Sequence, residues 1–104
     1  MTYFVPLGTT ISLYETTVNG SKTPTSPDAA AAYRIYGPTA TTCLLNGSFS
    51  GTEIDHSNAP WFFLASGVAV TSGNGFASGN TYTIRTQWAI SSTNFCNQQT
   101  LVVT

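Results

Sequence analysis

Charged side chains are scarce in this chain. They make up 7% of its 104 residues, against about a quarter in an ordinary soluble domain, and the net charge is −1. The basic residues are Lys22, Arg34 and Arg85, far apart in the sequence. Because a nucleic-acid surface must neutralise many phosphates, this composition excludes nucleic acid as a partner. Mixed surface charge normally keeps small domains from associating, and this chain has little of it. We therefore expect other proteins to cover part of its surface.

Long apolar runs and helix-forming runs are missing as well. No stretch approaches the roughly 20 apolar residues of a membrane span, and the start, MTYFVPLGTT, lacks the basic segment of an export signal. Outside residues 29–32 there is no continuous run of helix-forming residues. The chain is instead rich in threonine, with 18 residues, and 41% of it is hydrophobic. This composition favours strands in a folded chain.

Seven short strands are expected from alternating or apolar runs that lie between glycine, proline and asparagine turns. They cover residues 2–5, 9–18, 32–36, 41–49, 61–70, 80–91 and 95–104. A bend or break is expected at Gly67, and a hairpin turn about residues 92–94. Short strands at this spacing are typical of a two-sheet sandwich. The sequence therefore predicts an all-β chain that forms an antiparallel Ig-like β-sandwich of about seven strands, as a single domain over residues 1–104.

The clearest strand signal is the alternation within residues 80–91. One face of this strand is apolar apart from Thr86, and we expect its members in the core: Tyr82, Ile84, Trp88 and Ile90. The opposite face is polar and carries Thr81, Thr83, Arg85 and Gln87. Such a half-buried strand serves packing, so function is expected elsewhere in the chain.

Cys43 and Cys96 allow two interpretations. Both lie in expected strands, so they could bridge the two sheets and stabilise the fold by on the order of 4 kcal/mol in the chain-entropy model. The missing export signal instead favours a reducing compartment, where two buried free thiols act as small hydrophobic side chains. With a single histidine in the chain, the two cysteines are one ligand short of a zinc site.

The lone histidine, His56, lies in an acidic segment with Glu53 and Asp55. His56 could act as a base with an orienting acid, or the two acids could share a calcium ion. Neighbours on an extended loop point in different directions, so we expect a solvated loop without a catalytic or metal-binding role. No nucleophile, base and orienting group can be named together anywhere in the chain. The sequence therefore predicts no enzyme and no cofactor.

Trp61, Phe62 and Phe63 are consecutive, so a strand must direct at least one of them away from the core. An exposed aromatic residue there could anchor a protein interface or stack on a sugar ring, while burial on both faces is the alternative. The N-terminal edge strand and the acidic loop are the other places to look for contacts. The candidate partner-binding residues are Trp61, Phe62, Phe63, Tyr3, Phe4 and His56.

Five segments of the chain together carry a resemblance to a known family. They are FVPLGTTISLYETT, TPTSPDAAAAYRIYG, LLNGSFSG, WFFLASG and GFASGNTYTI. In this order they resemble the small Ig-like β-sandwich modules of tailed-phage virion proteins, of the capsid decoration or cement type. Residues 52–60 and the two cysteines depart from that pattern. The resemblance covers most of the chain and implies a binding or scaffold part with no catalytic residues.

The function that this resemblance implies is that of a virion structural protein, which binds the outer capsid shell and stabilises it. Its partners would be the major capsid protein or other virion proteins, and it would be assembled into the virion in the host cytoplasm. A homo-oligomer is compatible with this role. A tail, neck or fibre component is the alternative in the same setting. From the residues alone, a carbohydrate-binding module using Trp61, Trp88 or a tyrosine is a further alternative.

Overall fold

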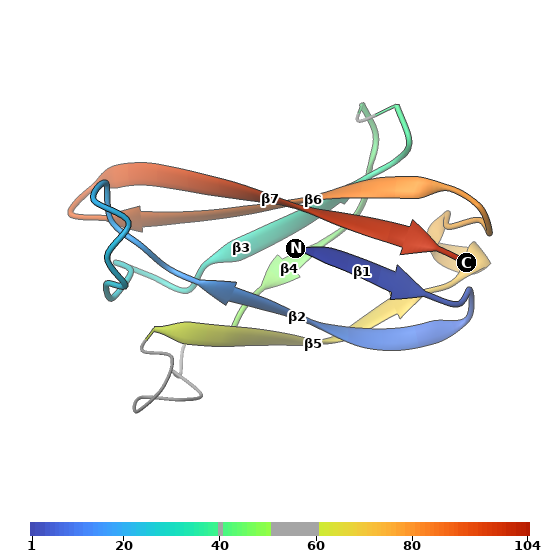
Figure 1. The fold of residues 1–104 in the computed structure, drawn as a ribbon, viewed down its shortest axis with the longest axis horizontal. Coiled ribbons are helices and arrows are strands. Elements are labelled where there is room, and N and C mark those ends of the chain that lie inside the picture. The colour runs from blue at the N-terminus through green and yellow to red at the C-terminus, as the bar shows by residue number, and fades with distance from the viewer. Residues whose placement is uncertain (40, 51–60) are drawn as a thin grey trace.

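The computed structural model describes residues 1–39, 41–50 and 61–104. Seven strands of this described part form two sheets that face each other (Figure 1). One sheet has the order β1-β7-β6-β3-β4, and the other pairs β2 with β5. The strands are β1 (Thr2–Val5), β2 (Thr9–Thr16), β3 (Ala32–Tyr36), β4 (Cys43–Ser48), β5 (Phe62–Val70), β6 (Thr81–Ile90) and β7 (Thr93–Val103). A short 3-10 turn, Ser72–Asn74, follows β5.

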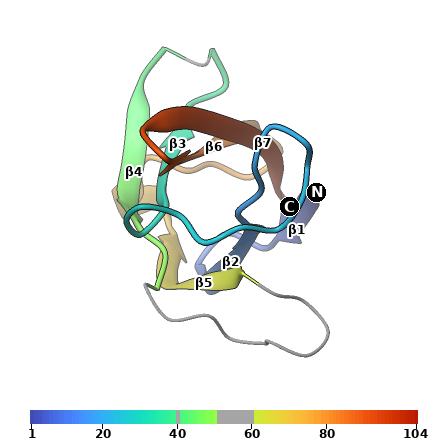
Figure 2. The same ribbon diagram turned by 90° about the vertical axis from the view of Figure 1, so that its left-hand side faces the viewer.

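The strand order is that of an Ig-type sandwich. Antiparallel pairs join β3, β6 and β7 in one sheet and β2 with β5 in the other, while β1 runs parallel to β7. Seen from the end, β7, β6 and β3 lie above β2 and β5 (Figure 2). At the corner between β5 and β6, the Tyr82 hydroxyl accepts a 2.8 Å hydrogen bond from the backbone N–H of Ala77, as in the tyrosine corner of Ig folds. The predicted all-β Ig-like sandwich is confirmed.

The core lies between the sheets and takes alternate residues from the strands. From β6 it takes Tyr82, Ile84 and Trp88, all buried. Ile90 was expected there too, but it is only half-buried because it ends β6 beside an exposed turn. The other strands contribute their own buried hydrophobic residues: Val5, Leu13, Tyr33, Ile35, Phe63, Ala65, Val68, Val70, Leu101 and Val103.

The strand β5 continues through Gly67 rather than breaking there. Its pairing with β2 shifts between Ile11, which lies opposite Val68, and Leu13, which lies opposite Ala65. The strand β5 therefore holds one extra residue, a β-bulge. Gly67 has a φ of 74°, a conformation that glycine adopts without steric cost. The bulge lets apolar residues on both sides of it face the core.

The hairpin between β6 and β7 turns at Ser91 and Ser92, so the prediction of a turn about residues 92–94 is wrong by one residue at its start and by two at its end. Both serines have positive φ, 50° and 66°, as a two-residue type I′ turn requires. The carboxylate of Asp28 accepts a 2.9 Å hydrogen bond from each serine N–H. In addition, the N–H of Asp28 donates to the carbonyl of Ala89 at 2.7 Å. A distant loop therefore holds the turn in place.

Candidate functional site

The N-terminal edge of the five-stranded sheet exposes large hydrophobic side chains. Met1, Phe4 and Leu7 are 72%, 71% and 38% exposed, and they are the exposed large hydrophobic residues of the described part. All three lie on β1 or directly beside it, and β1 is an edge strand. We call Met1, Phe4 and Leu7 the N-terminal apolar edge.

The alternation of β1 explains why Phe4 points outward. Val5 is buried, and Tyr3 is half-buried with its hydroxyl accepting a 3.0 Å hydrogen bond from the backbone N–H of Tyr14. Phe4 lies between these two in sequence and opposite Val102, on the outer face of the sheet. Of the two candidate partner-binding residues on this strand, Tyr3 therefore joins β1 to β2, and Phe4 is presented to solvent.

The three consecutive aromatic residues at the start of β5 lie in different environments. Phe63 is buried, so its assignment as a partner-binding residue is wrong: its register with Glu15 of β2 turns it into the core. Phe62 is half-buried, and its ring stacks on Tyr14 at a centroid distance of 5.4 Å. Trp61 is also half-buried, with its ring centroid 6.5 Å from that of Phe63.

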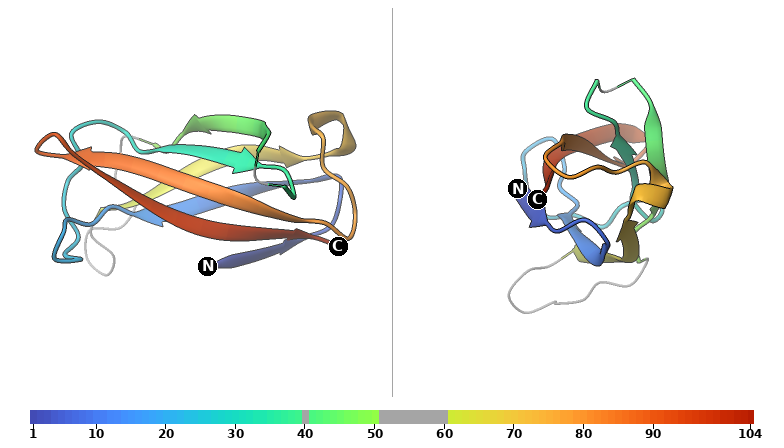
Figure 3. Two further views of the ribbon diagram at one scale, coloured as in Figure 1. Left: turned by 90° about the horizontal axis from the view of Figure 1, so that it is seen from above. Right: turned by 90° about the vertical axis from the view of Figure 1, so that its right-hand side faces the viewer.

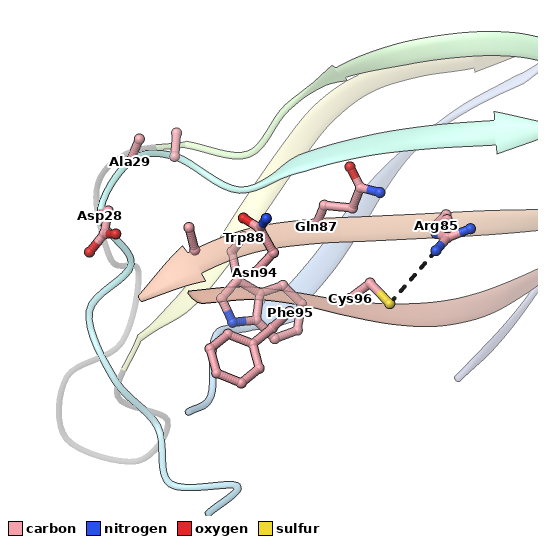
Figure 4. A pocket seen from close by; sticks show the side chains of 10 residues that line it. Asp28, Ala29, Arg85, Gln87, Trp88, Asn94, Phe95 and Cys96 are labelled. Carbon is pink, nitrogen blue, oxygen red and sulfur yellow. Dashed lines mark hydrogen bonds between the residues drawn. The ribbon is translucent and has the colours of Figure 1, made fainter. Parts of the chain in front are cut away.

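Trp88 is a structural residue and cannot serve as a platform for sugars. Its side chain is 6% exposed, and its indole N–H donates a 2.9 Å hydrogen bond to the carbonyl of Val18. The ring of Phe95 stacks against it at 6.4 Å (Figure 4). This placement corrects the alternative in which Trp88 contacts a carbohydrate.

No protein-family model, curated protein or solved structure matches this chain. The candidate His56 and its acidic neighbours Glu53 and Asp55 lie outside the described residues. Within residues 1–39, 41–50 and 61–104, no three His, Cys, Asp or Glu side chains gather as a metal site. The same residues contain no helix long and apolar enough to cross a membrane.

The fold brings together two arginines that are far apart in the sequence. Arg34 of β3 and Arg85 of β6 are direct cross-strand partners on the outer face of the five-stranded sheet, and both are exposed. The next residues in the same row, Asn46 of β4 and Gln98 of β7, are neutral. Like charges placed directly opposite each other weaken a sheet. The alternation within 80–91 placed Arg85 on an exposed face, but only strand pairing places Arg34 beside it.

Both cysteines are free and exposed (Figure 4 shows Cys96). The free state agrees with one of the two interpretations of the sequence, while the expected burial is wrong because both residues face away from the core. The guanidinium of Arg85 donates a long hydrogen bond to Cys96, with its Nη2 3.9 Å from Sγ.

We expect both thiols to react with a disulfide reagent such as DTNB in the native protein. Exposure gives the reagent access without unfolding, so native and denatured protein should release the same two equivalents. Single Cys43→Ser and Cys96→Ser variants would each release one. A thiol that reacts only in denaturant would contradict the exposed positions.

The half-buried, hydrogen-bonded hydroxyl of Tyr3 predicts a loss of stability at alkaline pH. Burial raises the pKa of Tyr3 above its ordinary value, and the negative charge of Glu15 raises it further, although the hydrogen bond from Tyr14 opposes the shift. Burial also raises the pKa of Tyr33. Between the unfolded pKa, about 10, and the higher folded pKa, the unfolded chain loses a proton that the folded chain retains. Stability is therefore full below about pH 10 and falls as the pH rises through the folded pKa.

Urea denaturation between about pH 8 and pH 11 measures this effect. We expect Tyr3→Phe to be less stable than the natural protein at neutral pH, because the N–H of Tyr14 loses its acceptor. Its stability should then fall less steeply above about pH 10. Equal slopes for the two proteins would contradict a raised pKa at Tyr3.

Proposed function

We propose that this chain is a virion structural protein of the capsid decoration type, which binds the outer shell and stabilises it without catalysis. The observation that supports this most directly is the N-terminal apolar edge, where Phe4 is exposed on an edge strand and Met1 is exposed directly before it. Exposed apolar residues on a strand with unpaired backbone groups are typical of a protein-binding site. The low content of charged residues fits a surface that another protein covers.

Stabilisation in this proposal is passive. Fully burying a side chain such as Phe4 or Met1 against a shell protein contributes about 1.5–3 kcal/mol. A decoration protein repeats that contact at each of its binding positions, so a modest energy per copy sums to a large one over the particle. A module that contacts two shell subunits at once resists their separation. A rigid sandwich with an apolar edge is suited to this role.

The experiment compares particles assembled with and without this protein. Particles that lack it should lose heat resistance, and purified protein added back should restore it. A copy number comparable with that of the shell subunits supports decoration, whereas far fewer copies would support the tail, neck or fibre alternative. Unchanged heat resistance without the protein would contradict the proposal.

Phe4→Ser tests the contact itself. We expect at least about a tenfold loss of affinity for particles that lack the protein, because removing one buried aromatic contact costs more than 1.4 kcal/mol. Its melting temperature should stay unchanged, since Phe4 is exposed. Tyr36→Ser is the control, a half-buried aromatic residue on β3 away from this edge, and, where it stays folded, it should bind as the natural protein does. Equal affinities for the two variants would sink the assignment of the N-terminal apolar edge.

A further inference from the structure

The edge of β7 is covered by β1 over only part of its length. The four residues of β1 pair with Thr100 to Val103, and no strand of the described part lies beside the remainder of that edge. Figure 3 shows β1 beginning beside the middle of β7. The N–H groups of Thr100 and Thr104 donate to the carbonyls of Met1 and Val5, which sets the alternation along this side.

Every second residue of β7 directs its backbone groups toward β1, because the ladder bonds of a strand alternate between its two neighbours. Counting back from Thr100, the uncovered residues with this orientation are Gln98, Cys96 and Asn94. Their N–H and C=O groups form an open edge about 17 Å long, at about 3.3 Å a residue. An extended segment can pair with this edge as β1 does further along.

A groove runs beside this open edge, between β7 and β2. It consists of two adjoining hollows of about 470 and 580 Å³ that share Glu15, Thr16 and Asn97. Met1, Tyr14 and Phe62 line the outer part of one hollow, and Trp88 and Phe95 line the other. We call these two hollows the β2–β7 groove. It offers apolar walls at both ends and a polar centre.

A buried carboxylate lies at the centre of the groove. Glu15 is 7% exposed and accepts hydrogen bonds from the side-chain amides of Asn97, at 3.1 and 3.3 Å, and of Gln99, at 3.1 Å. These donors are neutral, and no described residue forms a salt bridge with it. The side chain of Gln99 is 4% exposed, and its Oε1 has no hydrogen-bond partner. The backbone N–H of Thr16 donates a further 3.1 Å hydrogen bond to the Glu15 carboxylate. The carboxylate is therefore hydrogen-bonded but lacks a cation, although burying a charge without an opposite charge is costly.

We propose that the β2–β7 groove binds an extended segment of another protein, which adds to the open edge of β7 and places a lysine or arginine on Glu15. The inference rests on the proposed function, since it describes how a shell protein is held. Backbone hydrogen bonds supply affinity in this mode, and the side chain that enters the groove supplies specificity.

A second copy of the chain does not supply this segment. The edge strands of the two sheets, β1, β4, β2 and β5, contain no basic residue. Arg34 and Arg85 lie on β3 and β6, which have a strand on each side. Lys22 lines the outer part of the groove in the same chain and forms no salt bridge with Glu15. We therefore assign the cation to a different protein, with Lys22 of a second copy as the outcome that self-association at high concentration would reveal.

The test uses the capped peptide Val-Thr-Val-Thr-Lys-Thr-Val-Thr-Val with the whole natural protein, followed by amide NMR. We expect shifts and slowed hydrogen exchange at Asn94, Cys96 and Gln98. Replacing the central lysine of the peptide with glutamate should lower affinity at least about tenfold, because a like charge then faces Glu15. Glu15→Gln should remove most of this preference. Equal binding of the two peptides, shifts confined to β4, or no shifts at about 1 mM peptide would overturn the proposal.

Gln98→Pro tests strand addition separately from charge. Proline is tolerated where the N–H faces outward from an edge, so circular dichroism should show the fold retained, while peptide binding is lost. Gln98→Ala keeps that N–H and should bind normally. The natural protein, Gln98→Pro and Glu15→Gln are each added to particles that lack the protein. If all three restore heat resistance equally well, the groove proposal fails and the decoration function stands. If the natural protein does not bind particles, the function fails, and the peptide experiment still decides the groove.

Discussion

Trp88→Ala should lower the free energy of unfolding by about 3–5 kcal/mol, the range found when large buried aromatic residues are truncated. Domains of this size have a total stability of about 5–15 kcal/mol, so the variant should melt at a much lower temperature or be partly unfolded. The indole packs in the core against Phe95 and joins β6 to the chain after β2 through its hydrogen bond to Val18. Removing it opens a cavity at that end of the sandwich.

Trp88→Phe separates the packing of the indole ring from its hydrogen bond to Val18. The ring is largely retained while the hydrogen bond to Val18 is lost, so a cost of about 1–2 kcal/mol is expected. Urea denaturation followed by circular dichroism measures both variants. Phe95→Ala is the matched control for the neighbouring, half-buried ring and should cost less than Trp88→Ala. A cost below about 1 kcal/mol for Trp88→Ala would contradict the buried position, since such values are typical of surface residues.

Asp28→Ala should destabilise the hairpin between β6 and β7. The carboxylate accepts from the N–H groups of both Ser91 and Ser92, and neither serine is favoured at the positive φ that it adopts. Hydrogen bonds to a charged group contribute about 1.5–3 kcal/mol each when buried. Because Asp28 is exposed, we expect a total of about 1–2 kcal/mol. Denaturation and hydrogen exchange at Thr93 and Asn94 report the loss.

The coupling between this carboxylate and the turn can be measured with Ser92→Gly. Glycine adopts positive φ without a steric penalty, so Ser92→Gly alone should stabilise the protein slightly. With glycine at position 92 the positive φ no longer requires the carboxylate of Asp28 to hold it. Asp28→Ala should therefore lower the free energy of unfolding by less than it does in the natural protein. Additive effects of the two changes would show that Asp28 does not hold the backbone of the turn.

Much of the fold was predictable because its determinants are local. The alternation within 80–91 assigns Tyr82, Ile84 and Trp88 to one face whatever lies opposite, since successive side chains of a strand point to opposite sides. The glycine and proline turns indicated where each strand begins and ends to within a few residues. Short strands at this spacing then indicated a sandwich. The N-terminal edge was also named from sequence, because a proline and a glycine follow a short aromatic strand there.

Several features of the candidate sites could not be predicted, because they depend on which strands meet. Among three consecutive aromatic residues, the strand register determines which one is buried. Here the pairing of β5 with β2 buries Phe63. Nothing in the sequence near Glu15 indicates that β7 will bring Asn97 and Gln99 to it across more than 80 residues. The two-residue turn at Ser91 lacks the usual glycine, and a carboxylate 63 residues away holds it.

The sequence by itself determined an all-β chain with few charges, the apolar face of β6 and the positions of most turns, because propensity and alternation act over neighbouring residues. Tertiary structure decided which residues meet. It placed Arg34 beside Arg85, left the edge of β7 uncovered before Thr100 and buried the carboxylate of Glu15 without a cation. Strand pairing joins residues that are distant in the chain, so contacts across a sheet or between sheets carry no local signal.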